Sequence, residues 1–311
     1  MEKSSTIFIA GHNGLVGSAL LRTLKKRGYY NIIIRGRAEL DLTNQIDVNA
    51  FFEKEKPEYV FLSAAKVGGI HANSTYPVEF GYINGMIELN ILNAAHQHKV
   101  KKLLFLGSSC IYPKNCQQPI KEEYLLSGEL EKTNEIYALV KIFGLKMCES
   151  YYKQYGDNFI SAMPCNLYGI NDNFHYENSH LIPALIRRIH DAKSNQIPSL
   201  KIWGTGRARR EVLFADDFAD VCIFLMDNYN DSSPINIGTG YDYSITEIYQ
   251  IISNIIGYQG NFYFDSSKPD GTIQKLLDIS KIKNLGWQPR HSFEEGIRIT
   301  YNWFLNNPIR S

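Results

Sequence analysis

The chain has 311 residues and an almost balanced charge, with 33 Lys and Arg against 32 Asp and Glu. At roughly 150 residues per domain, this length suits one large or two modest domains with a sizeable core. The net charge of +1 gives no electrostatic support for general binding to nucleic acid or to a membrane surface. Five cysteines without a C-x-x-C pair indicate neither a disulfide framework nor a zinc ribbon, so we expect no metal site.

The cysteine usage and the first residues both favour a cytoplasmic protein. Cysteines without a disulfide pattern suit a reducing compartment. The apolar run before Gly11 is too short for the core of a signal peptide, and no later stretch approaches the length of a membrane span. We therefore expect a soluble, cytoplasmic, enzyme-sized protein with neither membrane nor nucleic acid as a partner.

Short apolar runs alternate with helical patterns over the first half of the chain. The predicted order begins with a strand at 6–10, a glycine turn and a helix from 15 to 28. Short buried strands separated by helices predict an α/β fold of the Rossmann type, with a doubly wound parallel sheet and right-handed crossovers. The remaining elements are strands at 31–34, 59–65, 102–108 and 158–164 and helices at 44–55, 78–98 and 133–155, the last capped by Thr133 or Asn134.

Beyond residue 165 the pattern loosens into Asn-rich turns. Helices are predicted near 181–193, 216–228 and 244–256, with short strands at 200–203 and 211–214. We expect a dinucleotide-binding domain over residues 1–165, which includes the helix at 133–155. A smaller α/β substrate-binding lobe is expected mainly over 166–311, with some of its segments returning to the first domain.

Three glycines lie where the first strand leads into the first helix. Gly11, Gly14 and Gly17 would let the backbone approach a pyrophosphate at the helix N-terminus. Their G-x-x-G-x-x-G spacing differs from the G-x-G-x-x-G dinucleotide fingerprint. The alternative is a tight turn with close strand–helix packing, but the βαβα order that follows favours a dinucleotide.

Two arginines follow the second strand. An NAD-selecting fold places Asp or Glu there for the ribose hydroxyls, whereas arginine suits a 2′-phosphate. Arg35 and Arg37 therefore favour NADP(H). The alternative is that both arginines only form a solvated strand edge.

A phenol and an ammonium are spaced for one helix face. Tyr137 and Lys141 are four residues apart on the predicted helix at 133–155. A nearby cation favours tyrosinate and lowers a pKa that is ordinarily about 10, so the phenol could exchange protons with a carbonyl or alcohol oxygen. The Tyr-x-x-x-Lys pattern occurs often by chance. Here, however, Ser108 ends the preceding strand, and ligands bind at such strand ends. Ser108 would there donate a hydrogen bond to the substrate oxygen.

Several longer motifs accompany this pair, namely AGHNGLVGSA, GSSCIYP, TNEIYALVK, NSHLIPALIRR, INIGTG and SKPDGTIQKLLD. With them the sequence resembles the extended short-chain dehydrogenase/reductases over nearly its whole length. It is most similar to the branch that epimerises GDP-4-keto-6-deoxy-mannose at C3 and C5 and reduces C4 with NADPH. The resemblance implies a homodimer that converts a GDP-4-keto-6-deoxy sugar into GDP-L-fucose or a closely related GDP-sugar.

The resemblance also implies roles for individual residues. Ser108, Tyr137 and Lys141 would form the reducing triad, with Cys110 and His180 as the epimerisation pair. The residues expected around the GDP-sugar are Ser109, Arg188, Trp203, Arg210, Asp270 and Lys275. The residues expected around the cofactor are Gly11, Asn13, Gly14, Leu15, Val16, Gly17, Arg35, Arg37, Asp41, Leu42, Ala64, Ala65, Lys66, Leu106, Gly107, Ser108, Tyr137, Lys141, Pro164, Asn166, Leu167 and His180.

One position departs from that family. Asn13 stands where its members often carry an arginine that helps hold the 2′-phosphate. A preference for NADP therefore depends on Arg35 and Arg37.

The chemistry of a ketosugar independently explains a cysteine–histidine pair. A C4 ketone acidifies the protons on C3 and C5, so a base on one face and an acid on the other can invert each carbon. Cysteine and histidine ordinarily have pKa values of about 8.5 and 6.5, which suits them to this exchange if the site lowers the pKa of the thiol. The alternatives are a packed apolar cysteine at Cys110 and a capping or surface histidine at His180.

The remaining basic residues also have two interpretations. Arginine side chains match diphosphate oxygens, so Arg188 and the cluster at 207–210 suit a nucleotide sugar, although they could lie on a solvated loop. Asp270 and Lys275 lie near a Pro-Asp-Gly turn, whose ordinary role is only to reverse the chain.

Three other functions stay open at this point. One is a C4 reductase of a GDP-4-keto hexose or heptose without epimerase activity. Another is a nucleotide-sugar 4-epimerase or 4,6-dehydratase with tightly held NAD. The third is a non-catalytic NADP(H) sensor, since fold alone does not fix function; the set of Ser108, Tyr137 and Lys141 argues against it.

Overall fold

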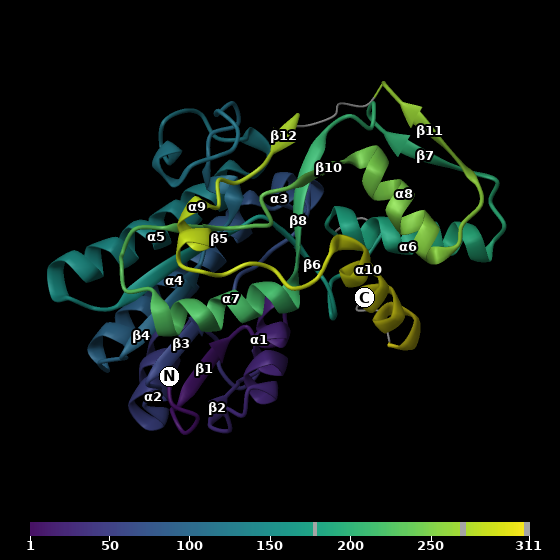
Figure 1. Ribbon diagram of the computed structural model, residues 1–311. Coiled ribbons are helices and arrows are strands. Elements are labelled where there is room, and N and C mark those ends of the chain that lie inside the picture. Colours follow the sequence, from purple (N-terminus) through teal and green to yellow (C-terminus); the bar gives the residue numbers. More distant parts are fainter. Residues whose placement is uncertain (177–178, 268–271, 308–311) are drawn as a thin grey trace.

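The computed structural model describes residues 1–176, 179–267 and 272–307 and is built around a parallel sheet of six strands. The sheet order is β2-β1-β3-β4-β5-β9, so the direction of winding reverses between β1 and β3 (Figure 1). Ligands of doubly wound folds bind at such a switch point, outside the carboxyl ends of the strands. The predicted fold class is confirmed. The strands are β1 (Ile7–Ala10), β2 (Ile32–Ile33), β3 (Tyr59–Leu62), β4 (Lys102–Leu106), β5 (Phe159–Pro164) and β9 (Ile235–Ile237).

The central strands are apolar on both faces because helices cover both sides of the sheet. Every residue of β1, β4 and β5 is buried. Parallel pairing sets Ala10 beside Leu62, Leu62 beside Phe105, and Leu106 beside Ala162. The loops that follow these strands therefore open at one common edge of the sheet.

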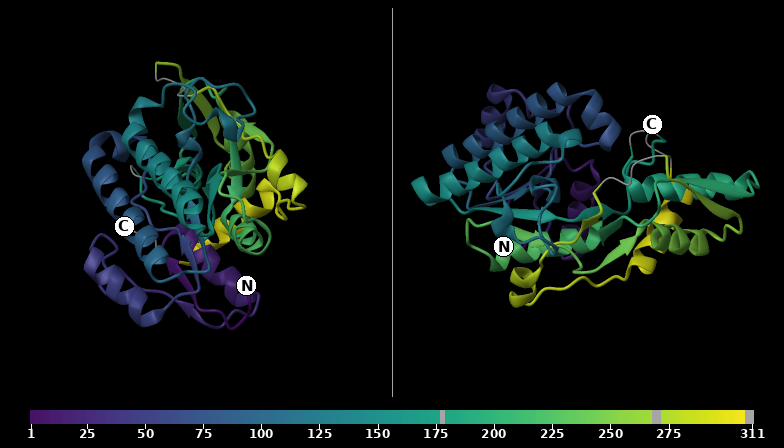
Figure 2. Two further views of the ribbon diagram at one scale, coloured as in Figure 1. Left: turned by 90° about the vertical axis from the view of Figure 1, so that its left-hand side faces the viewer. Right: turned by 90° about the horizontal axis from the view of Figure 1, so that it is seen from above.

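Helices form a layer on each face of this sheet (Figures 1 and 2). On one face α1 (Leu15–Lys26) packs along α7 (Ala215–Asn228). On the other face α4 (Pro77–Gln97) packs between α2 (Gln45–Glu55) and α5 (Glu135–Tyr155). The short connecting helices are α3 (Ile70–Thr75), η1 (Ser109–Ile111), η2 (Glu122–Tyr124) and η3 (Lys132–Asn134).

The start of α5 differs from the prediction. Asn134 occupies the position before the helix, but its side chain makes no capping hydrogen bond. The turn η3 precedes α5 instead, and the Glu131 carboxylate accepts a hydrogen bond from Thr133 N. Capping by Thr133 or Asn134 was therefore the wrong prediction.

A second apolar core lies beyond residue 165 and brings together residues between Tyr168 and Phe304. Its strand β8 pairs with β10, β12 and β6, while β7 pairs with β11. The elements of this part are β6 (Asn166–Tyr168), α6 (Leu181–Ser194), β7 (Ser199–Trp203), β8 (Arg209–Phe214), β10 (Asp242–Ser244), α8 (Ile245–Ile256), β11 (Asn261–Asp265), β12 (Gln274–Lys275) and α10 (Phe293–Asn306).

Three later segments pack against the first core. Helix α7, strand β9 and the stretch 277–287, which contains α9 (Ser280–Asn284), all contribute buried residues to it. Helix α7 and strand β9 are therefore segments after residue 165 that return to the first core. The sixth strand of the parallel sheet is β9, which pairs with β5.

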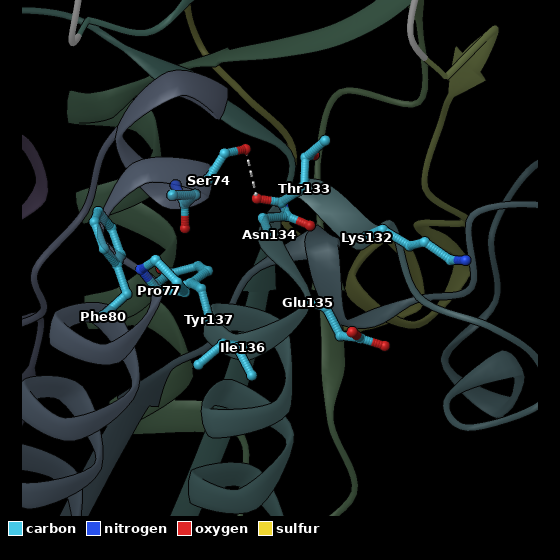
Figure 3. Close-up of a pocket in the computed structure, with 10 residues that line it drawn as sticks. Ser74, Pro77, Phe80, Lys132, Thr133, Asn134, Glu135, Ile136 and Tyr137 are labelled. Atoms are coloured by element: carbon cyan, nitrogen blue, oxygen red, sulfur yellow. Dashed lines mark hydrogen bonds between the residues drawn. The ribbon is translucent and has the colours of Figure 1, made fainter.

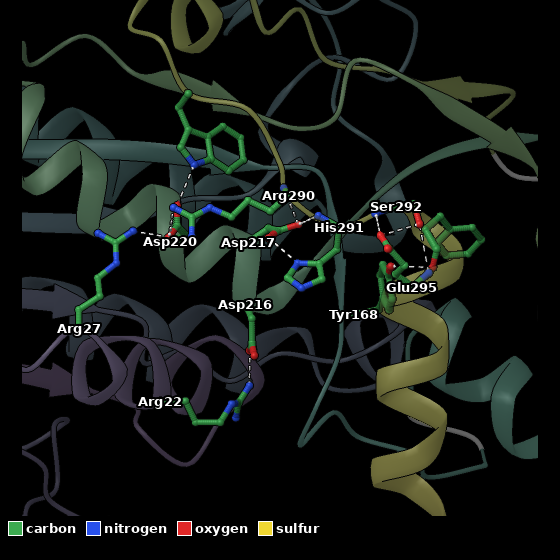
Figure 4. Close-up of polar contacts among 12 residues, drawn as sticks. Arg22, Arg27, Tyr168, Asp216, Asp217, Asp220, Arg290, His291, Ser292 and Glu295 are labelled. Atoms are coloured by element: carbon green, nitrogen blue, oxygen red, sulfur yellow. Dashed lines mark hydrogen bonds and ion pairs between the residues drawn. The ribbon is translucent and has the colours of Figure 1, made fainter.

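Aspartates of α7 fix this returning helix in place (Figure 4). The buried Asp217 accepts hydrogen bonds from the backbone N–H groups of Arg290 and His291, and its Oδ1 lies 2.8 Å from His291 Nδ1. This arrangement links α7 to the segment that enters α10. Two further aspartates of α7 bind α1 through the ion pairs Arg22–Asp216 and Arg27–Asp220.

Candidate active site

Ser108 and Cys110 share one short turn at the carboxyl end of β4. Ser108 precedes η1, and its Oγ accepts a hydrogen bond from Cys110 N at 3.3 Å. Both side chains are therefore positioned by the same local backbone. The turn lies directly after a strand that is buried along its whole length.

Tyr137 and Lys141 approach this turn from α5. Lys141 Nζ donates a hydrogen bond to the Leu106 carbonyl at 3.0 Å, which fixes α5 against the end of β4. The same nitrogen lies 5.9 Å from the centroid of the Tyr137 ring. The phenol, the ammonium and the Ser108 turn thus meet at one edge of the sheet, as the spacing of the motifs predicted.

The Tyr137 ring also borders a cavity of about 190 Å³ (Figure 3). The ring packs edge to face against Phe80, with centroids 6.2 Å apart. Ser74 Oγ donates a hydrogen bond to the Thr133 carbonyl at 3.3 Å on the opposite side of the cavity. The complete lining consists of Asn73, Ser74, Pro77, Phe80, Lys132, Thr133, Asn134, Glu135, Ile136 and Tyr137.

The surroundings of Tyr137 favour its protonated form. Burial raises the pKa of the phenol well above its usual value, and Cys110 and Glu88 act in the same direction. The charge of Lys141 does not reverse this, because its ammonium forms an ion pair with the buried Glu88 carboxylate at 3.0 Å. The predicted lowering of the Tyr137 pKa is therefore wrong, and the phenol is protonated at neutral pH.

Cys110 is a buried thiol that faces a cation from the second core. Burial raises the pKa of this thiol, while Lys275 and the hydrogen bond with Ser108 oppose the rise. The lowered pKa on which the thiol's part in epimerisation depends is therefore not found here, because desolvation outweighs the cation. Lys275 lies on β12 and pairs in register with Arg210 of β8, so the second core brings both cations to this edge.

His180 lies at the start of α6, away from these contacts. It occupies the N-cap position, and its ring is exposed to solvent. The protein around the ring still desolvates it enough to lower its pKa. Among the described residues no hydrogen bond or ion pair joins His180 to Cys110, so their pairing stays a prediction.

The glycine turn has the geometry of a dinucleotide site. Gly11 has a φ of 89°, and a Cβ at this position would lie 2.7 Å from Ala64 Cα. A Cβ at Gly17 would lie 2.1 Å from the Gly11 carbonyl oxygen, so β1, β3 and α1 meet too closely for side chains. Gly14 caps α1 without a side-chain hydrogen bond, and the first turn of α1 has no acidic residue. The free N–H groups and the partial positive charge at the N-terminus of α1 fit a pyrophosphate.

The two arginines after β2 have different surroundings. Arg35 Nη2 donates to Glu55 Oε1 at 2.6 Å, so a carboxylate of α2 already pairs with it. Arg37 is exposed at the same strand end. Asn13 is also exposed, and its carbonyl accepts a hydrogen bond from Asn171 Nδ2 at 3.1 Å. Arg37 is therefore the better placed of the two arginines to receive a 2′-phosphate.

Side chains of α4 hold two further loops that were predicted to bind cofactor. Asn84 Oδ1 accepts from Lys66 N at 2.6 Å, and its Nδ2 donates to Lys66 O at 3.0 Å. Asn90 Nδ2 donates to the Leu42 carbonyl at 3.0 Å. Next to it, Asp41 accepts two hydrogen bonds from Thr43, whose backbone N–H lowers the pKa of the Asp41 carboxyl. Residues 64–66 and 41–42 are thus fixed at the same edge.

The other predicted cofactor residues follow the same strands. Leu15 and Val16 begin α1. Leu106 ends β4, and Gly107 follows it. Pro164 ends β5, which places it beside the end of β4, while Asn166 and Leu167 lie in β6.

The predicted sugar-nucleotide residues lie mainly on the second core. Arg210 Nη1 donates to the Thr272 carbonyl at 2.7 Å, and Arg188 Nη2 donates to the Lys201 carbonyl at 2.7 Å. Trp203 ends β7 with 68% of its surface exposed. Ser109 is buried in η1, and Asp270 lies outside the described residues.

The basic cluster at 207–210 divides into different roles. Arg209 Nε donates to Asp242 Oδ1 at 2.7 Å, and the same arginine forms an ion pair with Glu247. This arginine fastens β8 to the start of α8. Arg210 instead lies beside Lys275 in register, and Lys275 is the cation that acts on Cys110.

Glu88 is the residue of this site that the sequence analysis missed. It lies one turn after Asn84 on the buried face of α4, within a largely apolar helix. An ionisable residue at a buried helical position is an available signal, because such side chains are rarely buried unless they are paired.

Known proteins resemble this chain over nearly its full length. A model of the NAD dependent epimerase/dehydratase family matches residues 7–238. GDP-L-fucose synthase 1 from Arabidopsis thaliana is 53% identical over 306 residues, which cover 98% of this chain and 95% of that protein. GDP-L-fucose synthase from Escherichia coli (strain K12) is 51% identical over 313 residues and 98% of each chain.

A solved structure shares the same architecture. A GDP-mannoheptose C4 reductase from Campylobacter jejuni with NADP bound is 40% identical, with a TM-score of 0.90 over 98% of this chain and 99% of that one. No helix of the described residues has both the length and the apolar composition to cross a lipid bilayer. The site geometry, the family model and the two relatives agree, and they confirm the resemblance seen in the motifs. The chain belongs to the NAD dependent epimerase/dehydratase family.

Proposed function

We propose that this chain is an NADPH-dependent epimerase/reductase of a GDP-4-keto-6-deoxy sugar, forming GDP-L-fucose or a closely related GDP-sugar. The observation that carries the proposal is the contact between Lys141 Nζ and the Leu106 carbonyl. That contact brings Tyr137 and Lys141 to the same sheet edge as Ser108 and the glycine turn. The two relatives named GDP-L-fucose synthases, at 51% and 53% identity, support the substrate class.

The reduction step uses the protonated phenol. Bound NADPH supplies the hydride that the C4 carbonyl carbon accepts. Ser108 Oγ–H donates a hydrogen bond to the carbonyl oxygen, and Tyr137 gives its proton to that oxygen as it becomes an alcohol. The Lys141 ammonium then stabilises the tyrosinate until solvent restores the proton.

The epimerisation step uses Cys110 and His180 as the acid–base pair. The C4 ketone acidifies C3 and C5, so removing one proton gives an enolate whose oxygen can bind Ser108 and Tyr137. Returning the proton on the opposite face inverts the carbon. Lys275 supports this step because it favours the thiolate form of Cys110.

The second core supplies the groups that suit a nucleotide diphosphate. Arg210 and Lys275 are adjacent in register and present two cations to the same edge. Arginine matches phosphate oxygens through paired hydrogen bonds. The exposed Trp203 indole can stack on a nucleobase. The cofactor thus lies on the first core, over residues 1–165 and the returning segments, and the sugar nucleotide mainly on 166–311.

NADPH is the preferred cofactor in this account. Arg37 lies exposed where the 2′-phosphate of a dinucleotide would follow β2. The similar Campylobacter jejuni structure contains NADP, which supports this preference.

The partner proposed for α4 and α5 is a second copy of the chain. These helices pack side by side and expose apolar residues, which include Tyr82, Leu89, Ile136, Leu139 and Phe143. Exposed apolar clusters mark interaction surfaces, and two-fold dimers are the commonest oligomers.

The reductase claim is tested with GDP-4-keto-6-deoxy-mannose and NADPH. The unmodified protein should consume NADPH, and Tyr137→Phe should lower kcat by about 100-fold or more because it lacks the transferable proton. Tyr152→Phe is the matched control, since it removes a phenol from the exposed side of the same helix. Loss of NADPH at an equal rate in Tyr137→Phe would contradict the proposal.

A second candidate is a C4 reductase without epimerase activity. The raised pKa of the Cys110 thiol favours it, because a neutral thiol is a weak base. The reaction in deuterated water separates the two functions. Deuterium at C3 and C5 of the product supports the epimerase/reductase, while its absence with full NADPH consumption supports the reductase alone.

A further inference from the structure

A buried carboxylate lies beneath the catalytic lysine. Glu88 on α4 is 1% exposed, and Lys141 on α5 is 3% exposed. Glu88 Oε1 lies 3.0 Å from Lys141 Nζ. Neither carboxylate oxygen has a hydrogen-bond partner among the described residues, so the contact with Lys141 is an ion pair. Apart from the lysine, the described structure thus gives this carboxylate no compensation for its loss of water.

The helix interface is shaped to hold this carboxylate. A Cβ at Gly144 of α5 would lie 2.4 Å from Glu88 Oε2 and 2.6 Å from Phe105 Cζ. Any larger residue at position 144 would therefore displace the carboxylate or the ring. The Phe105 ring also packs beneath Lys141, with Nζ 4.9 Å from its centroid. Glycine at this position leaves room for a charged pair where an apolar contact would otherwise close the interface.

Stability alone does not explain the pair. Removing two charges from water costs several kcal/mol, and apolar replacements of buried ion pairs are often neutral or stabilising. The pair is also located at the reacting end of α5, one turn from Tyr137. Its position therefore points to the chemistry of that phenol.

The ammonium of Lys141 has a hydrogen-bonded carbonyl and an ion-paired carboxylate beneath it. The Leu106 carbonyl and the Glu88 carboxylate lie on the side of β4 and α4, each 3.0 Å from Nζ. On its other side, Nζ lies 5.9 Å from the centroid of the Tyr137 ring. The acceptors therefore determine both the position of Nζ and how much of its charge reaches the phenol.

We propose that Glu88 is a positioning residue of the reduction step, whose carboxylate fixes the Lys141 ammonium and offsets part of its charge beneath Tyr137. This inference rests on the proposed function, because it assigns Tyr137 as the proton donor. Tyr137 and Cys148 of α5 and Cys110 of η1 are the ionisable groups of the described residues that face the Glu88–Lys141 pair. Glu88 acts with Cys110 and burial to raise the Tyr137 pKa, which keeps the donor protonated.

The first test is Glu88→Gln, which keeps the shape of the side chain and a carbonyl oxygen for Lys141 but removes the charge. The uncompensated ammonium should then favour tyrosinate. The alkaline limb of the kcat/KM profile for reduction should shift to lower pH by at least about one unit. An alkaline limb in its original place would overturn the proposal, whatever the change in kcat.

Cys148→Ala is the matched control because it opens space in the same helix interface without changing charge. Its thiol is buried on α5 one turn beyond Gly144. A purely structural role for Glu88 predicts the same outcome for both variants, with lower stability and an unmoved alkaline limb. The proposal predicts a displaced limb in Glu88→Gln alone.

Glu88→Asp gives a second measurement that does not depend on the folding of Glu88→Gln. It keeps the charge but retracts the carboxylate by one methylene. The alkaline limb should stay in place while kcat falls about tenfold or more, because the ammonium is displaced. An unchanged kcat would contradict the positioning role.

A spectroscopic titration keeps this inference separate from the proposed function. The ultraviolet absorbance of tyrosinate is followed with pH, and Tyr137 is isolated by subtracting the curve of the matching Tyr137→Phe protein. The difference curve should move to lower pH in Glu88→Gln. If the unmodified enzyme fails to reduce the ketosugar, the proposed function fails, yet a shifted titration still supports the Glu88–Lys141–Tyr137 coupling. An unshifted titration overturns the inference even where the enzyme is active.

Discussion

At the scale of single residues, the catalytic edge combines contacts that the sequence indicates with contacts that it does not. The i, i+4 spacing of Tyr137 and Lys141 placed both on one helix face, and the position of Ser108 after a strand located the partner. The spacing could not show that Glu88 would face Lys141, because that depends on which side of α4 packs against α5. The direction of the Tyr137 pKa shift was predicted wrongly because burial of the phenol, which the spacing does not show, is its largest cause.

The arginines after β2 provide a prediction at this scale. Arg37→Ser should raise the KM for NADPH about tenfold or more, because it removes a charge-assisted hydrogen bond to the 2′-phosphate. The KM for NADH, which has no such phosphate, should stay unchanged. Steady-state kinetics with both cofactors measure this.

Arg35→Ser is the comparison variant. Its guanidinium already pairs with Glu55, so its loss should affect the KM for NADPH less than the loss of Arg37. An equal effect of the two substitutions would show that both arginines bind the phosphate.

At the scale of elements, α4 positions three separate parts of the site. Asn84 holds the loop after β3, Glu88 binds the catalytic lysine, and Asn90 holds the loop after β2. All three side chains are buried, since α4 packs between α2 and α5. Helix α4 thus connects the cofactor loops with the catalytic end of α5.

The prediction at this scale concerns the proposed dimer interface on the outer sides of α4 and α5. Leu139→Glu combined with Phe143→Glu should convert the proposed dimer to a monomer, because two charges would be buried in an apolar interface. Sedimentation equilibrium gives the mass directly. Ile46→Glu, at a more exposed apolar residue of α2, should leave the mass of the dimer unchanged. A monomeric unmodified protein would contradict the proposed interface.

Strongly periodic elements were predicted well, and elements defined by distant pairing were not. The strands and helices up to residue 164 follow from alternating apolar runs. Strand β9 has three residues and is recognisable only because Ala162 of β5 pairs with Ile235. Helix α10 was also not predicted, although Ser292 and Glu295 form a capping box that the sequence displays.

At the scale of the whole molecule, Glu211 connects elements of both cores. This buried glutamate of β8 accepts hydrogen bonds from Thr239 N and Gly240 N at 2.7 Å and from Leu277 N at 2.9 Å. Burial raises the pKa of its carboxyl from 4.5 to about 7, although the three hydrogen bonds oppose the rise. The chain after β9 and the chain before α9 therefore meet at one titratable group.

This group predicts a pH dependence of stability. Between pH 4.5 and about 7 the folded protein binds the Glu211 proton and the unfolded chain releases it, so stability from this group falls as pH rises. The difference of 2.5 pH units corresponds to about 3 kcal/mol as an upper value. Urea unfolding at pH 5 and pH 8 should show that Glu211→Gln gains free energy of unfolding relative to the unmodified protein at the higher pH.

The exposed Glu53 supplies the control for this measurement. Glu53→Gln makes the same substitution at a glutamate that is exposed in the folded protein, and its unfolding is measured alongside. Parallel curves for Glu211→Gln and the unmodified protein would show that Glu211 titrates in the folded protein as it does in the unfolded chain.

The most direct measurement follows the hydride itself. NADPH that carries deuterium at the transferred position is incubated with the enzyme and GDP-4-keto-6-deoxy-mannose in ordinary water, and the product is examined by NMR. The account predicts one deuterium on C4 of the sugar, and about 100-fold less of this labelled product from Tyr137→Phe over the same time. A GDP-sugar product without deuterium on C4 would contradict the assignment of this edge as a ketone-reducing site.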